Sequence, residues 1–151
     1  MAYDDMDFDQ LFDEADVPTP DRIFKLEACL RRGRTVEEMH EKTNVDPWYL
    51  DQMLRITEER FAIESSSIDA MSKRDWKRAK QFGFSDAQMA YLWSTPETTV
   101  SENEVRVARK AAGIEPTYKT VDTCGAEFDA ETPYHYSTWE DSTEVLSLIH
   151  I

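Results

Sequence analysis

The stretch Asp21 to Met53, DRIFKLEACLRRGRTVEEMHEKTNVDPWYLDQM, decides the fold because it is dense in signals for helix starts and ends. Just before it, Thr19-Pro20 supplies an N-cap and a first-turn proline, and Gly33 supplies a stop. These signals predict a helix over about Pro20 to Arg32. Helical spacing predicts a buried face made of Ile23, Leu26 and Leu30.

Two more helices are predicted in the same stretch. Thr35 and Glu38 match a capping box for a short helix that ends near Asn44, a residue that tolerates a left-handed backbone. Asp46-Pro47 then begins a longer helix to about Ile63. Its expected buried stripe consists of Leu50, Met53, Leu54, Thr57 and Phe61.

Similar signals continue downstream. Ser72 begins a helix that ends at Gly83. Two further capping boxes, each followed by a helix, are Ser85 with Gln88 and Ser101 with Glu104. The sequence therefore predicts an all-α fold, a small domain of about six helices followed by an extended or short-strand C-terminal segment.

That C-terminal segment, Tyr118 to Trp139, reads YKTVDTCGAEFDAETPYHYSTW and contains five aromatic residues without a helical apolar period. Its first part, up to Cys124, alternates and is rich in β-branched residues, which predicts a short strand. A tight turn at Cys124-Gly125 should follow. We expect its later aromatic side chains, Phe128, Tyr134, Tyr136 and Trp139, to pack on protein outside this chain.

A faint internal repeat separates two segments by 50 residues. The pattern Gly33-x-Thr35-x-x-Glu38-Met39 aligns with Gly83-x-Ser85-x-x-Gln88-Met89. In each, a helix stop is followed at once by a capped short helix. Duplication and two independent uses of common helix punctuation both explain this pattern.

The net charge of −14 is concentrated at the two ends of the chain. Residues 1–16 hold seven acidic residues and no Lys or Arg, and so do residues 122–144. The middle carries 17 acidic and 17 basic residues and is neutral. A neutral centre with acidic ends argues against nucleic-acid binding.

Several features indicate a cytoplasmic protein. The N-terminus lacks the basic and apolar regions of a signal peptide, and no apolar run approaches the ~20 residues of a membrane span. The chain holds two cysteines, Cys29 and Cys124. Without a secretion signal, two reduced thiols are favoured over a disulfide.

Two segments suggest binding, and each has a structural explanation. Thr35 to Ile56 has the rhythm of a helix-turn-helix, but its second helix is too acidic to face phosphates, which favours a packing role. Basic residues also surround Trp76, namely Lys73, Arg74, Lys77, Arg78 and Lys80. We expect Trp76 to face inward and all five bases to lie on a solvated face or to dock on an acidic neighbour.

No catalytic, cofactor-binding or metal-binding residue is predicted. The histidines His40, His135 and His150 form no metal-ligand spacing with the cysteines. Cys124 with His135 faintly suggests a nucleophilic pair, but a buried thiol is favoured. The four glycines are scattered, so no phosphate-binding loop is present in the sequence.

The two quoted stretches, Asp21 to Met53 and Tyr118 to Trp139, together resemble the large subunit of carbamoyl-phosphate synthase. The first resembles the opening of its helical oligomerization domain, and the second resembles the junction into its second synthetase half. The resemblance covers most of Asp21 to Asp141. It implies a fragment of an ATP-dependent ligase that makes carbamoyl phosphate from bicarbonate, glutamine-derived ammonia and two ATP, for arginine and pyrimidine synthesis.

The resemblance also implies partners and boundaries. ATP and magnesium or manganese would belong to the synthetase halves, and the partners would be those halves, a glutaminase small subunit and further copies of the enzyme. The expected divisions are an acidic remnant of the preceding synthetase domain (1–17), the helical domain (18–116), the junction into the second, ATP-grasp half (117–145) and a non-native tail (146–151). The alternative is an independent helix-turn-helix protein that binds DNA or another protein.

Overall fold

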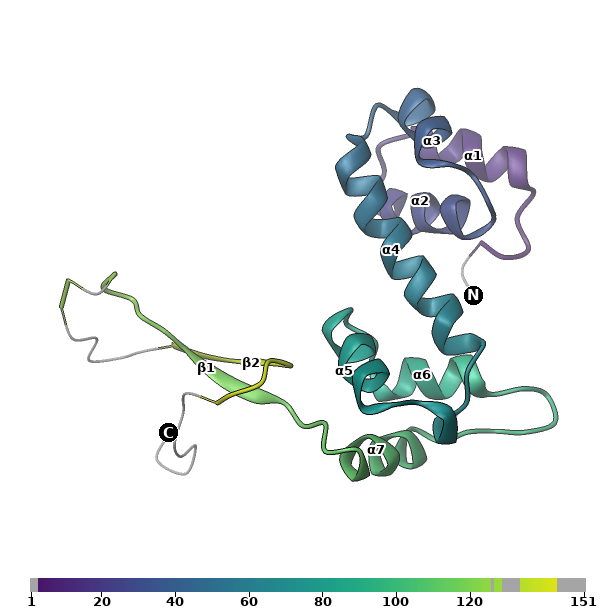
Figure 1. Cartoon of the computed structure of the whole chain (residues 1–151). Coiled ribbons are helices and arrows are strands. Elements are labelled where there is room, and N and C mark those ends of the chain that lie inside the picture. The colour runs from purple at the N-terminus through teal and green to yellow at the C-terminus, as the bar shows by residue number, and fades with distance from the viewer. Residues whose placement is uncertain (1–2, 126, 129–133, 144–151) are drawn as a thin grey trace. The chain divides into compact units, whose positions relative to one another are not determined.

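The computed structural model describes residues 3–125, 127–128 and 134–143, which form seven α-helices, one 3-10 helix and two strands (Figure 1). The helices are α1 (Phe8–Asp16), α2 (Arg22–Arg31), α3 (Val36–Thr43), α4 (Pro47–Glu64), η1 (Ile68–Ala70), α5 (Lys73–Gln81), α6 (Asp86–Trp93) and α7 (Glu102–Ala111). The strands are β1 (Thr117–Val121) and β2 (Tyr134–Thr138). The chain divides into two compact units, unit 1 (Met1–Ala62) and unit 2 (Ile63–Ile151). A mostly helical fold is thus confirmed.

Helix α1 of unit 1 was not predicted. Its N-cap is Asp7, whose side chain accepts hydrogen bonds from the backbone N–H groups of Asp9 and Gln10. Leu11 and Ala15 of α1 are fully buried and belong to the core of unit 1. The other buried members of that core are Leu26, Ala28, Cys29, Leu30, Met39 and Leu50.

Two predictions about unit 1 are wrong in part. Helix α2, predicted to begin at Pro20 with Thr19 as its N-cap, begins at Arg22 with Asp21 as its N-cap. Leu26 and Leu30 are buried as expected, but Ile23 is 58% exposed. Along α4, Leu50 and Thr57 are buried, whereas Phe61 is 44% exposed. Periodicity located these helices but misplaced one edge of each buried face.

The helix punctuation is confirmed at both segments of the repeat. Capping boxes form at Thr35 with Glu38 and at Ser85 with Gln88. The helix before each capping box, α2 in the first case and α5 in the second, ends with the same three backbone hydrogen bonds. At the end of α2, the backbone N–H groups of Arg32, Gly33 and Arg34 donate to the carbonyls of Ala28, Leu30 and Cys29, respectively. At the end of α5, those of Phe82, Gly83 and Phe84 donate to the carbonyls of Arg78, Lys80 and Ala79. Every donor and acceptor in the second set lies 50 residues after its counterpart, so the α2–α3 and α5–α6 corners share one local backbone design.

Unit 2 combines a helical core with the strand pair. Its buried core residues are Ile63, Trp76, Ala79, Phe84, Met89, Ala90, Val105 and Ile114. The predicted strand is confirmed as β1, and it pairs antiparallel with β2, with Thr117 opposite Thr138 and Val121 opposite Tyr134. Strand β2 was not predicted. Between the strands, Gly125 has a φ of 61°, which fits the expected turn.

The aromatic residues after β1 behave differently from one another. Phe128 and Tyr134 are 76% and 71% exposed, as expected for side chains that await a partner. Trp139 instead packs against the helical core of unit 2. The expectation that all of these aromatics pack on protein outside the chain is therefore wrong for Trp139.

Candidate functional site

The basic helix α5 presents only part of its charge outward. Trp76 is buried, as predicted, and so is Ala79, while Lys73 and Arg74 are exposed. Lys80 was expected on the outer face, but it is only 6% exposed. Because one lysine points inward, its charge must be compensated inside the protein.

That compensation is a buried charge cluster of Lys80, Asp86 and Arg109, each at most 9% exposed. The Arg109 guanidinium donates from Nε to both Asp86 oxygens, at 2.9 and 3.1 Å, and from Nη2 to Oδ2 at 2.8 Å. Lys80 Nζ donates to Asp86 Oδ1 at 3.0 Å. Backbone carbonyls accept further bonds, since Lys80 donates to Phe84 O and Arg109 Nη1 to Ile114 O.

Two opposing effects act on the Asp86 carboxyl. Burial by itself raises the pKa, but the hydrogen bonds and charges of Arg109 and Lys80 outweigh burial and hold the pKa below its usual value. The carboxylate therefore stays ionised at neutral pH. One carboxylate faces two cations, so the cluster carries a net buried positive charge.

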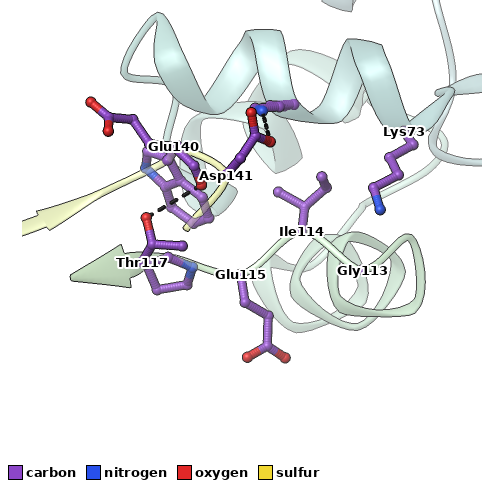
Figure 2. Close-up of a pocket in the computed structure, with 10 residues that line it drawn as sticks. Lys73, Gly113, Ile114, Glu115, Thr117, Glu140 and Asp141 are labelled. Atoms are coloured by element: carbon purple, nitrogen blue, oxygen red, sulfur yellow. Dashed lines mark hydrogen bonds and ion pairs between the residues drawn. The ribbon is translucent and has the colours of Figure 1, made fainter. Parts of the chain in front are cut away.

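A pocket of about 290 Å³ lies where α5, the end of α7 and the strand pair meet (Figure 2). Lys77 forms an ion pair with Asp141, whose carboxyl points toward α5. This pair lowers the pKa of the Asp141 carboxyl. The other charged residues of the lining are Lys73, Glu115 and Glu140. With both signs in its wall, the pocket shows no preference for a phosphate or a cation.

An apolar groove of about 470 Å³ lies in unit 1 between α2 and α4. Its apolar walls consist of Ile23, Leu26, Val45, Tyr49, Met53 and Ile56. Ile23, Tyr49 and Ile56 are 58%, 61% and 44% exposed. Among the described residues that line the groove, Arg22 carries the one charge, and its guanidinium already donates to the carbonyls of Ala15 and Thr43. The groove is therefore suited to apolar protein contact.

The suggested nucleophile and its partner lie in different local settings. Cys124 is in the turn after β1, beside Thr123, and His135 lies on β2, with Nδ1 3.2 Å from Thr120 Oγ1. Both thiols are free. Burial raises the pKa of the Cys29 thiol to about 11, so this cysteine is unreactive at neutral pH. His150 lies outside the described residues.

The helix-turn-helix rhythm corresponds to α3, a turn at Asn44–Asp46, and α4. Asn44 has the predicted left-handed φ of 54°, and His40 Nδ1 donates to the Val45 carbonyl at 2.8 Å. Met39 of α3 and Leu50 of α4 are fully buried in the same core. The pair of helices thus packs as part of unit 1.

The described part of the chain holds neither a metal-ligand cluster nor a membrane-spanning helix. Within residues 3–125, 127–128 and 134–143, no three His, Cys, Asp or Glu side chains lie where they could hold a metal ion. No helix there is long and apolar enough to cross a bilayer.

Sequence reasoning missed the two most informative features, the buried charge cluster and the apolar groove. Lys80, Asp86 and Arg109 are spread over 30 residues and meet only through the packing of three helices. Ile23 and Ile56 looked like ordinary helix residues. The adjacent aromatics Trp48 and Tyr49 at the start of α4 were the one local hint of an exposed apolar surface, and both are more than 60% exposed.

Comparison with known proteins identifies the family of this chain. Residues 2–113 match a family described as the oligomerisation domain of the carbamoyl-phosphate synthetase large chain. Relatives named carbamoyl phosphate synthase large chain include proteins of Nostoc sp. (43% identical over 85% of this chain), Beutenbergia cavernae (44% over 89%) and Archaeoglobus fulgidus (41% over 85%). The chain spans only 11–12% of the length of these relatives. It therefore belongs to the family of the carbamoyl-phosphate synthetase large chain, as its oligomerisation domain.

Proposed function

We propose that this chain is a non-catalytic module that spaces and assembles the large subunit of a glutamine-dependent carbamoyl-phosphate synthase. The parent would make carbamoyl phosphate from bicarbonate, ammonia from glutamine and two ATP, in the cytoplasm, for arginine and pyrimidine synthesis. Its ATP and magnesium or manganese would bind in the synthetase halves. We assign no catalytic, cofactor-binding or metal-binding residue to this chain.

The proposed partners are the flanking synthetase halves, a glutaminase small subunit and further copies of the parent. Residues 18–116 would form the helical domain, 117–145 the junction into the second half, and 146–151 a non-native tail. The sequence predicts that residues 1–17 belong to the preceding domain. The packing of α1 on α2 favours counting residues 8–16 with the helical part instead.

The apolar groove of unit 1 is the observation that carries this proposal. An exposed apolar surface of this kind marks a protein contact, and the mostly apolar walls match an apolar partner surface. We assign the groove to a second copy of the parent chain, because the matched family is described as an oligomerisation domain. The alternative, an independent helix-turn-helix protein that binds DNA or another protein, is disfavoured, because α3 and α4 pack on the core of unit 1.

Sedimentation velocity of the full-length parent tests this assignment. Replacing Ile23 and Ile56 together with Asp places two charges in the groove and should weaken association by about tenfold or more. The matched control is Phe24→Asp, because Phe24 is 62% exposed on the same helix but does not line the groove. Circular dichroism would confirm that both variants remain folded.

The expected result is a shift of the double variant to smaller species, with Phe24→Asp like the wild type. An unchanged distribution for the double variant over a wide concentration range would exclude the groove as the assembly surface. Equal shifts in both proteins would point to a general effect of surface charge.

A further inference from the structure

The buried charge cluster of unit 2 is one negative group short. Asp86 is its single carboxylate, whereas Lys80 and Arg109 bring two cations, both at most 6% exposed. Buried cations require a compensating partner. The backbone carbonyls of Phe84 and Ile114 accept hydrogen bonds from them but carry no net charge.

The indole ring of Trp139 lies against both cations. Its centroid is 5.0 Å from Lys80 Nζ and 5.2 Å from Arg109 Cζ. An aromatic face attracts cations through its negative quadrupole, and tryptophan does so most strongly, especially where water is excluded. Trp139 thus supplies the negative face that the cluster lacks.

Trp139 brings its neighbours with it to α5. Gln81 Nε2 donates to the Trp139 carbonyl at 3.4 Å, and Lys77 pairs with Asp141. On the other side, Thr117 Oγ1 of β1 donates to the Glu140 carbonyl at 3.3 Å (Figure 2). Residues 139–141 therefore join the end of β2 to the helices.

We propose that the Lys80–Asp86–Arg109 cluster is a receptor site for Trp139, and that docking of this ring latches the β1–β2 hairpin onto the helical core of unit 2. The ring provides most of the holding energy, because it meets two desolvated cations. The Lys77–Asp141 pair adds little, since the Asp141 side chain is 92% exposed. The latch is a property of this chain and does not depend on the reaction of the parent.

Nuclear magnetic resonance of the 151-residue chain tests the contact itself. In the wild type, the ring current of Trp139 should move the side-chain methylene protons of Lys80 and Arg109 upfield. Trp139→Leu keeps an apolar side chain but removes the aromatic face, so these shifts should disappear. Trp139→Phe should retain part of them, because it keeps a smaller aromatic face.

Hydrogen exchange tests the latch. In Trp139→Leu, the amides of Thr117–Val121 and Tyr134–Thr138 should exchange roughly tenfold or more faster, as expected from losing a desolvated cation–π contact. Trp139→Phe should recover part of the protection. Tyr136→Leu, a change to a half-exposed aromatic on the same hairpin, should have a smaller effect. Lys77→Met should also change the exchange only slightly.

The amides of α5 and α6 report whether unit 2 stays folded. The proposal is overturned if the Lys80 and Arg109 protons are unshifted in the wild type. It is also overturned if Trp139→Leu leaves hairpin exchange unchanged, or if it affects the hairpin no more than Tyr136→Leu does. If Trp139→Leu unfolds unit 2, Trp139→Phe decides, since failure to restore protection would contradict the role of the aromatic face.

Discussion

At positions 50 residues apart, unit 1 carries Leu30 and Val36 where unit 2 carries Lys80 and Asp86. The two corners end their first helix with matching backbone bonds and begin the next with a capping box. In unit 1 the pair is apolar and packs into the core. In unit 2 it is a buried ion pair that also contacts Arg109.

This difference shows that helix punctuation and core chemistry are set separately. Glycine stops and capping boxes shape the corner in both units, whatever the core contains. The charged version adds a property that the apolar version lacks, because it holds cations for Trp139. The shared backbone does not decide between duplication and common punctuation, because the same three backbone bonds also end α7, at Ala112, Gly113 and Ile114.

The largest expected difference between the corners comes from truncating one member of each pair. Asp86→Ala would leave two buried cations without their carboxylate and should destabilise unit 2 by about 3–5 kcal/mol. Val36→Ala, at the equivalent position, should cost unit 1 only about 1 kcal/mol, since it removes a half-buried apolar group. Urea unfolding with amide exchange resolved for each unit measures both. Similar losses would break the comparison.

Acid should act on the same charged corner, with a smaller effect than truncation. The pKa of Asp86 is lowered on folding. The ionised carboxylate therefore stabilises unit 2 above its unfolded pKa of about 3.9, and this stabilisation is lost as the pH falls through the folded pKa. The reference is the variant Lys80→Leu, Asp86→Val, Arg109→Met, which lacks the titrating carboxyl and replaces the buried charges by apolar side chains, so its helices should still fold.

The measurement is the stability of unit 2 in both proteins between pH 7 and pH 2. The difference between the two curves should stay flat from pH 7 to about pH 5 and change only below about pH 4. Other carboxylates with lowered pKa values, such as Asp75 and Glu104, are shared and cancel in this difference. A difference that does not vary with pH would show that Asp86 is not the titrating group.

The glycines that follow α2 and α5 should respond alike to substitution by alanine. Gly33 and Gly83 have φ values of 105° and 92°, and an added Cβ would meet no heavy atom within 4 Å at either position. Gly33→Ala and Gly83→Ala should therefore cost backbone strain alone, about 1–2 kcal/mol each. Thermal unfolding of the two variants would show this equality. A much larger loss at one glycine would mean that the corners are not equivalent.

The smallest expected effect concerns the capping boxes. Thr35 Oγ1 accepts from Glu38 N at 3.1 Å, and Ser85 Oγ accepts from Gln88 N at 3.0 Å. Thr35→Ala and Ser85→Ala should each cost about 1 kcal/mol. Thr35→Ser and Ser85→Thr, which keep the hydroxyl group, should cost less. Amide exchange at the first turns of α3 and α6 provides the readout.

Local signals explain what the sequence could predict. A capping box joins residues three positions apart, and a left-handed stop needs only Gly33 or Asn44, so helix ends were found without knowing the fold. The buried face of each helix was harder to predict than its ends. Ile23 was assigned to the core by its spacing, but burial on α2 depends on α1, and α1 was not predicted.

Features that join distant residues were beyond single-sequence reasoning. Strand β2 forms by pairing with β1, whose nearest residue, Val121, is 13 positions before Tyr134. The inward direction of Lys80 depends on Asp86 and on Arg109, 23 residues after Asp86. Trp139 was expected to pack on protein outside the chain, but it packs on the helical core of unit 2.

We propose above that this chain takes part in the assembly of its parent and catalyses no reaction itself. Magnesium-dependent ATP turnover by the purified 151-residue chain tests it most directly, with a buffer blank and the full-length parent as references. We predict turnover equal to the blank, because we assign no nucleotide-binding or metal-binding residue to the chain. Turnover above the blank that a single substitution within the chain abolishes would contradict the account.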